Sequence, residues 1–183
     1  MYQLILFGPP GVGKGTQAEM IALKLDLFHL STGEVLRKAV ADGTELGKEA
    51  KVIMDSGALV TDDIMIGIVR DALKNNSKKN GFILDGFPRT IAQAEALNEM
   101  FGELKYDNVR VLNLTADDNE LVARLLKRGR SDDTEETIKH RLSVYYSSTA
   151  PVKGVYDKLD IVTNINGMGS KDDINKEILE ILG

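Results

Sequence analysis

The chain has 183 residues, with 23 Lys or Arg against 28 Asp or Glu, so its formal net charge is −5. This length fits one domain of about 150 residues with small insertions, and the 43% hydrophobic content is enough for a buried core. The lack of cysteine excludes disulfides, zinc–thiolate sites and thiol nucleophiles. The acidic balance argues against nonspecific nucleic-acid binding. We expect no signal peptide and no membrane span, and hence a cytosolic protein.

Short apolar runs and helical periodicity alternate along the chain. The apolar runs predict five strands, at residues 2–7, 28–30, 81–84, 109–114 and 159–165. Apolar residues at helical spacing predict helices at 14–25, around 50–54, and at 64–73, 90–101, 117–128 and 173–182. Strands that alternate with helices indicate an α/β fold, in which a doubly wound, five-stranded parallel sheet is covered on both faces.

The connection between the second and third strands is unusually long. It spans about fifty residues, whereas a crossover between parallel strands needs only about a dozen. It contains helical patterns but no strand pattern. We therefore predict a small helical insert, at residues 31–60 of a single 1–183 domain. Ser31 and Glu34 have the spacing of a capping box at its start, and Glu45, Asp62 and Asp63 are expected in the first turns of later helices.

A glycine-rich loop joins the first strand to the first helix. It runs from Gly8 to Thr16 with the spacing G-x-x-x-x-G-K, in which backbone N–H groups cradle phosphates and Lys14 reaches the terminal phosphates. The residue after the lysine is Gly15 rather than the Ser or Thr that binds Mg²⁺, and Thr16 follows. This loop alone does not separate GTPases, motor ATPases and small-molecule kinases.

Arginine is concentrated in one short part of the chain. Of eight arginines, four lie within eighteen residues, and they are Arg124, Arg128, Arg130 and Arg141. The planar guanidinium grips phosphate oxygens bidentately, so the cluster predicts a mobile clamp over phosphates. The alternative is a solvated helix face with i,i+4 ion pairs. Asp133 is expected to cap the helix that carries Arg141.

The segment GFILDGFPR, residues 81–89, combines a buried strand with polar residues at its end. Asp85 ends the predicted strand, and ligands of parallel sheets bind outside the carboxyl ends of the strands. A carboxylate there can hold Mg²⁺ through water. Gly86 permits close backbone approach, and Pro88 fixes a turn that directs Arg89. We assign no role to His29.

These motifs together resemble the adenylate kinase family over nearly the whole chain. The similar stretches are GPPGVGKGTQ, LSTGEVLR, GFILDGFPRTIAQAEAL and RGRSDDTEETIKHRL, and the Gly-Thr ending of the phosphate loop is normal in that family. The resemblance implies a P-loop nucleoside-monophosphate kinase fold with a helical AMP-binding insert and a lid. It also implies reversible phosphoryl transfer from MgATP to AMP, giving two ADP.

The resemblance also implies roles for individual residues. The implied ATP-binding residues are Gly11, Val12, Gly13, Lys14, Gly15, Thr16, Arg124, Arg128 and Gly169. The implied AMP-binding residues are Thr32, Arg37, Ala58, Leu59, Val60, Gly86, Phe87, Pro88, Arg89, Gln93, Arg130 and Arg141. The implied catalytic residues are Lys14, Arg89, Arg128, Arg130, Arg141 and Asp85, of which Asp85 would organise Mg²⁺ through water.

Two local features refine this expectation. The amide of Gln93 can both donate and accept, which suits the Watson–Crick edge of adenine and favours AMP over UMP. Many members carry a long, sometimes zinc-binding, lid insertion that this chain lacks, so we expect a short lid at residues 128–138, no zinc and a monomer. The alternatives are a related kinase with another acceptor and a nucleotide-binding switch that hydrolyses ATP slowly. A switch has no need of an acceptor clamp.

Overall fold

A five-stranded parallel sheet forms the centre of the computed structural model, which describes residues 1–75 and 80–183. The strands are β1 (Tyr2–Phe7), β2 (Phe28–Ser31), β3 (Gly81–Asp85), β4 (Val109–Thr115) and β5 (Val162–Asn166). Their order in the sheet is β2-β3-β1-β4-β5, and every neighbouring pair is parallel. The predicted fold class is confirmed.

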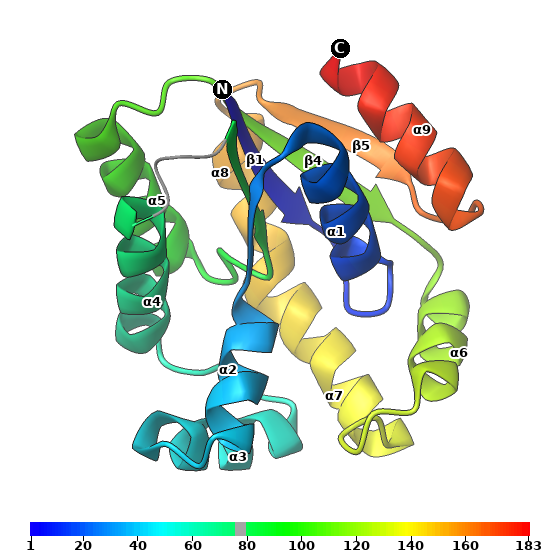
Figure 1. The fold of residues 1–183 in the computed structure, drawn as a ribbon. Coiled ribbons are helices and arrows are strands. Elements are labelled where there is room, and N and C mark those ends of the chain that lie inside the picture. Colours follow the sequence, from blue (N-terminus) through cyan, green and yellow to red (C-terminus); the bar gives the residue numbers. More distant parts are fainter. Residues whose placement is uncertain (76–79) are drawn as a thin grey trace.

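Helices cover both faces of this sheet (Figure 1). They are α1 (Lys14–Leu25), α2 (Thr32–Ala41), α3 (Glu45–Ser56), α4 (Asp62–Asn75), α5 (Ile91–Leu104), α6 (Asp118–Arg128), α7 (Glu135–Val144), α8 (Lys153–Asp157) and α9 (Lys171–Leu182). A π-helical turn and a 3₁₀ turn join α7 to α8, so residues 135–157 form a nearly continuous helical segment. No helix in the described part of the chain is long and apolar enough to cross a bilayer.

Alternation along the central strand builds the two cores. In β1, Leu4 and Leu6 belong to a cluster that includes apolar residues of α1, α6, α7 and α9. Ile5 and Phe7 point to the opposite face and belong to a cluster with apolar residues of α2, α4, α5 and α8. Because successive side chains of a strand alternate between faces, the apolar run of β1 is buried on both sides. This is the pattern expected of a covered parallel sheet.

Parallel pairing brings the carboxyl ends of three strands to one edge. Leu6 of β1 pairs with Asp85 of β3, and Ser31 of β2 also pairs with Asp85. The chain between β2 and β3 forms α2, α3 and α4, and α2 and α3 lie below this edge in Figure 1. The long connection is therefore helical in its described residues, and it lies next to the strand ends.

The fifth strand begins later than predicted. Residues 159–161 precede β5, because the chain leaves α8 through a turn in which the N–H groups of Leu159 and Asp160 donate to the carbonyls of Tyr156 and Asp157. Leu159 is 55% exposed, so its apolar character does not place it in the sheet. The other strand and helix boundaries differ from the predicted ones by a few residues.

Neither predicted capping box forms. Ser31 does precede α2, but its hydroxyl lies 3.4 Å from Asp85 Oδ2 instead of capping the helix. Helix α7 is capped by Thr134, which accepts from the N–H of Thr137 at 3.1 Å. Asp133 is one residue too early to cap and binds arginines instead.

Two glycine substitutions should separate a required glycine from a dispensable one. At Gly81 the backbone has φ +144° and an added Cβ would lie 1.8 Å from the Tyr2 carbonyl oxygen, so Gly81→Ala should lower the free energy of unfolding by more than about 2 kcal/mol. Gly67 lies inside α4 and has no described heavy atom within 4 Å of an added Cβ. Gly67→Ala should stabilise the protein by about 0.5–1 kcal/mol.

Urea denaturation followed by circular dichroism measures both changes. Equal stability of Gly81→Ala and the unsubstituted protein would contradict the close approach of β1 and β3 at this position.

Candidate active site

A cavity of about 430 Å³ opens at the carboxyl edge of the sheet. Its wall is built from the loop after β1, from α2, from the connection between α3 and α4, from the loop after β3, and from α6 and α7. The predicted site residues that line it are Gly11, Gly13, Lys14, Gly15, Thr16, Thr32, Arg37, Ala58, Leu59, Val60, Asp85, Gly86, Phe87, Pro88, Arg89, Gln93, Arg124, Arg128, Arg130 and Arg141. The folded chain thus brings together segments up to about 130 residues apart.

Two predicted residues are placed elsewhere. Val12 is 1% exposed and belongs to the core beneath the loop. Gly169 lies in the exposed turn between β5 and α9. Neither is part of the cavity wall.

The loop after β1 has the shape of an anion-binding nest. Gly13 precedes α1 with φ +102°, which favours glycine, and the N-terminus of α1 points its free N–H groups toward the cavity edge. Lys14 Nζ donates to the carbonyls of Gly8 at 2.8 Å and Pro9 at 2.9 Å. The lysine is thereby held across its own loop, with the positive end of the helix behind it.

The ammonium of Lys14 carries an electrostatic cost in this position. Burial lowers the pKa of Lys14 to about 8; Asp85 opposes this, and the positive charges of Arg89 and Arg128 lower the pKa further. Burial likewise lowers the pKa of Arg89 from its usual range. Neighbouring positive charges in a partly desolvated cavity are stabilised when an anion binds among them.

Asp85 provides a carboxylate beside the phosphate loop. It ends β3, and its Oδ2 lies 3.5 Å from the position that a Cβ on Gly15 would occupy. Glycine at this position therefore leaves room between the start of α1 and the carboxylate.

The turn after β3 is held to α2 and directs an arginine. Thr32 Oγ1 donates to the carbonyl of Gly86 at 2.9 Å, and Arg89 Nε donates to the same oxygen at 2.7 Å. The Phe87–Pro88 peptide bond is cis. These contacts fix the guanidinium of Arg89 at the cavity wall.

The arginines of α6 and α7 are held by two aspartates. Arg128 donates to both carboxylate oxygens of Asp133, at 2.9 and 2.7 Å, and Arg141 donates to Asp133 at 3.0 Å and also to Asp132. The side chain of Asp133 is fully buried. Burial acts to raise the pKa of Asp133, but hydrogen bonds and charge from Arg128, the N–H of Arg130 and the charge of Arg141 outweigh it and hold the pKa below its usual value.

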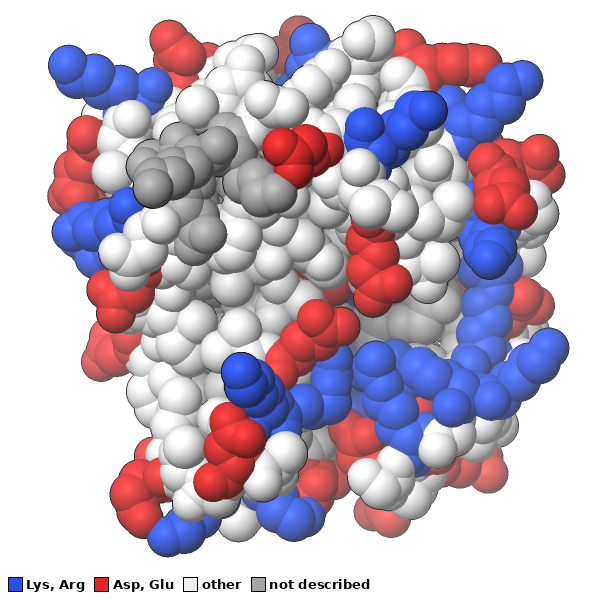
Figure 2. Space-filling view, viewed as in Figure 1, with Lys and Arg blue, Asp and Glu red and all other residues white. Residues whose placement is uncertain are grey.

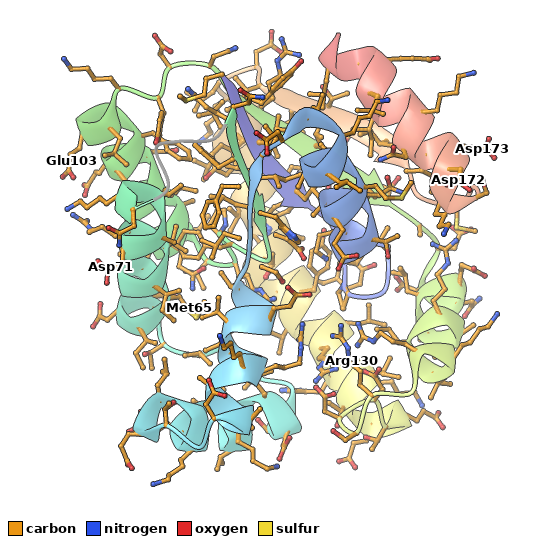
Figure 3. All side chains as sticks on the ribbon, in the orientation of Figure 1. Met65, Asp71, Glu103, Arg130, Asp172 and Asp173 are labelled. Carbon is orange, nitrogen blue, oxygen red and sulfur yellow. The ribbon has the colours of Figure 1, made fainter. Side chains whose placement is uncertain are left out.

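The cavity mouth is strongly basic. Figure 2 shows Lys and Arg side chains forming a band across the lower right of the view, over the region of α6 and α7. Arg130, labelled in Figure 3, lies in front of α7 between α2 and α6. Its pKa is lowered by burial and by the positive charges of Arg128 and Arg37.

Arg124 makes contacts that fit both interpretations of the arginine cluster, the solvated helix face and the phosphate clamp. It donates to Glu120 at 2.7 Å, an i,i+4 pair within α6. It also donates to the carbonyl of Gly167 at 2.8 Å while lining the cavity. The solvated-face alternative therefore describes one contact of Arg124 but does not describe the placement of Arg128 or Arg141.

Sequence reasoning missed three aspartates. Asp133 was expected only to cap α7 and no role was predicted for Asp132, although two acidic residues that closely follow Arg128 and Arg130 were a signal of pairing. Asp62 was expected in the first turn of α4, where it is found. It also accepts a hydrogen bond from Gln93 Nε2 at 2.8 Å, and no feature of the sequence joins these residues.

The acidic side chains of the cavity are suited to a metal ion that is bound mainly by nucleotide phosphates and only partly by the protein. Within residues 1–75 and 80–183, no group of three or more His, Cys, Asp or Glu side chains could hold a metal ion by itself. Mg²⁺ bound to nucleotide phosphates needs only one or two protein carboxylates. Asp85 fits this requirement, because it lies opposite Gly15 at the edge of the phosphate loop.

Comparison with known proteins decides the family. A family model described as adenylate kinase matches residues 6–161. The adenylate kinase of Leptospira biflexa (strain Patoc 1) is 51% identical, with 98% of this chain and 99% of the relative covered. Adenylate kinases of Synechococcus sp. (strain RCC307) and Thermobifida fusca are 47% and 45% identical, each over at least 97% of both chains.

The chain belongs to the adenylate kinase family. Members of this family are phosphotransferases, which confirms the predicted enzyme class and disfavours the nucleotide-switch alternative. The family match includes the phosphate loop, the turn after β3 and the arginines of α6 and α7, all within residues 6–161.

ATP binding should depend on pH through Lys14. Its pKa of about 8 means that the ammonium loses its proton as the pH rises through this value. Bound phosphates favour the charged form, so ATP binding should take up a proton, and ATP affinity should fall by up to about tenfold per pH unit above that pKa.

Calorimetry in two buffers of different ionisation enthalpy measures this uptake, with AMP as the control ligand. ATP affinity that stays constant from about pH 7 to 9.5, without proton uptake, is incompatible with this assignment.

Proposed function

We propose that this adenylate kinase transfers a phosphoryl group reversibly from MgATP to AMP, giving two ADP, within the single cavity at the carboxyl edge of the sheet. The observation that carries the proposal is the layout of that cavity. In Figure 1, the phosphate loop and α6 lie to the right of α2 and α3, and Figure 3 places Arg130 between α2 and α6. Residues of all these segments line the one cavity. Two nucleotides could therefore meet head to head across the arginines.

The donor end would hold ATP. The backbone of residues 11–16 would wrap the phosphates, including the N–H of Val12, whose side chain is buried beneath the loop. Lys14 would exchange its two carbonyl partners for phosphate oxygens. Arg124 and Arg128 would face the nucleotide, and the turn that contains Gly169 would touch the adenine through its backbone.

The acceptor end would hold AMP. Thr32, Arg37 and the turn from Gly86 to Arg89 would surround its phosphate, and the 58–60 segment with Gln93 would surround the base. Leu36, Val60 and Met65 contribute apolar side chains to the same wall. An apolar wall with a few placed polar groups is the usual construction of a small-molecule site.

Catalysis would rest on positioning and charge. A phosphate oxygen of AMP attacks the γ-phosphorus of ATP, and the bond from that phosphorus to the oxygen bridging to the β-phosphate breaks. Lys14, Arg89, Arg128, Arg130 and Arg141 would neutralise charge on the moving group without any proton transfer. Mg²⁺ brought with ATP would supply further positive charge, and Asp85 would hold it through water.

Closure would exclude water from the reaction. Residues 128–138 act as a short lid and residues 31–60 as an AMP-binding insert, and both approach when nucleotides bind. Arg128 and Arg141 are paired with Asp132 and Asp133, so phosphates would compete with these carboxylates for the two arginines. We further propose that the enzyme is monomeric and cytoplasmic, and that it acts on ATP, AMP and ADP without nucleic acid or a membrane as partner.

The phosphate-loop assignment is tested by Lys14→Met. Loss of the ammonium should reduce the rate by at least about a hundredfold, because charge stabilisation of the transferring group is lost. The assay follows ADP formation from ATP and AMP, and the reverse reaction. A near-normal rate in both directions would remove this assignment.

Arg89→Lys tests the bidentate grip. It should lower kcat by more than about tenfold, because lysine keeps the charge but not the planar fork. Arg70→Lys is the matched control, since Arg70 lies on α4, away from the cavity wall, and pairs with Glu103 of α5 at 3.6 Å. The two carboxylates Asp71 and Glu103 mark this outer face in Figure 3. Equal kcat for both variants would refute the role of Arg89.

Acceptor choice and stoichiometry separate the remaining alternatives. AMP should be used in preference to UMP and CMP at saturating ATP, and preference for a pyrimidine would identify a related kinase with another acceptor. Titration should show two nucleotide sites, or one site for two adenosines linked by five phosphates. A single site that ignores AMP would indicate a switch.

A further inference from the structure

Gln93 is held by two partners of opposite hydrogen-bonding character. Its Oε1 accepts from the backbone N–H of Arg89 at 2.7 Å, and its Nε2 donates to Asp62 Oδ1 at 2.8 Å. The side chain is 2% exposed and lines the cavity. Asp62 comes from the start of α4 and Gln93 from the first turn of α5, so the contact joins two elements 31 residues apart.

These partners fix the positions of the oxygen and the nitrogen in the Gln93 carboxamide. A backbone N–H can only donate and a carboxylate can only accept, so neither would tolerate the amide turned by 180°. Reversal would place Nε2 against an N–H and Oε1 against an anion, and both groups are partly withdrawn from water. Each mismatch in such an environment is costly.

Asp62 is itself held in place. The same Oδ1 accepts from Thr90 Oγ1 at 3.1 Å, and Thr90 caps α5 by accepting from the N–H of Gln93 at 3.1 Å. The carboxylate, the hydroxyl and the amide therefore form one connected network between α4 and α5. Met65, one turn further along α4 and labelled in Figure 3, belongs to the same cavity wall.

We propose that Asp62 is a positioning residue that locks Gln93 in the one orientation able to recognise a 6-aminopurine. The inference rests on the proposed AMP site. With one bond of each polar atom already used, Gln93 retains one acceptor lone pair on Oε1 and one N–H on Nε2. Adenine offers an amine that donates and a ring nitrogen that accepts, which matches this pair.

Hypoxanthine offers the opposite pair, because its 6-oxo group accepts and its N1–H donates. A freely rotating glutamine amide would adapt to either base by turning over. A locked amide cannot, so the base of inosine monophosphate would leave donor facing donor and acceptor facing acceptor. Sites built on fixed hydrogen bonds reject mismatched ligands strongly, because their buried polar groups are left unpaired.

The first measurement uses the unsubstituted enzyme with AMP and inosine monophosphate as acceptors at saturating MgATP. We expect kcat/KM for inosine monophosphate to be at least about a hundredfold lower than for AMP. Equal kcat/KM for the two acceptors would contradict the fixed orientation of Gln93, while phosphoryl transfer to AMP would still stand. Lack of activity with AMP itself would instead overturn the proposed function.

The second measurement compares variants at position 62. Asp62→Ala should raise the KM for AMP about tenfold, lower the AMP-to-inosine monophosphate ratio of kcat/KM about tenfold, and leave kcat for AMP within about twofold. Asp62→Asn keeps an oxygen that accepts from Nε2, so it should retain most of the selectivity. Asp63→Ala removes the exposed neighbouring carboxylate from the same helical turn and should leave the ratio unchanged.

A purely structural role predicts a different result. If Asp62 only joined α4 to α5, Asp62→Ala would lower kcat/KM for both acceptors by the same factor, and the ratio would stay constant. That result overturns the proposal, as does loss of selectivity in Asp63→Ala. Thermal unfolding of each variant confirms that the compared proteins are folded, and Asp62→Asn keeps the comparison available where the alanine variant does not fold.

Discussion

Partly buried positive charge at the carboxyl edge of the sheet is the constraint on which the rest of the site depends. Lys14 and Arg89 lie close enough to influence each other, and both have pKa values lowered by burial. Asp85 offsets only part of this cost, because burial and the neighbouring guanidinium groups still lower the pKa of both side chains. A bound phosphate would relieve the remaining cost, so the cavity is suited to an anionic ligand.

Two aspartates hold the arginines of α6 and α7 in a defined arrangement. Arg128 and Arg141, from helices on either side of a short connection, both bind Asp133, whose carboxylate is fully buried. A buried carboxylate is strongly stabilised by such partners and costly to leave without them. Under the proposed function, phosphates that draw the arginines away would therefore also move the connection between α6 and α7. This competition is the proposed link between nucleotide binding and movement of residues 128–138.

The proposed recognition of the base depends on hydrogen-bond direction rather than on charge. Several positive groups line the proposed phosphate region together, among them Lys14, Arg89 and Arg128. At Gln93, by contrast, the oxygen and the nitrogen of one amide are fixed by two partners of opposite character, the N–H of Arg89 and the carboxylate of Asp62. Under the proposed roles, phosphate binding and base choice therefore rest on different groups of one cavity.

Four features can be predicted from the amino-acid sequence alone: the parallel α/β fold, the phosphate loop, the strand-to-turn segment ending at Arg89 and the arginine cluster. Each of these features is local, because it can be recognised from apolar periodicity, from glycine spacing or from a short run of residues. The pairing of Asp133 with Arg128 and Arg141, and of Asp62 with Gln93, becomes visible only in the folded chain. Those contacts depend on how helices pack across the cavity, and residue type specifies a possible partner without specifying which one the fold brings within hydrogen-bonding distance.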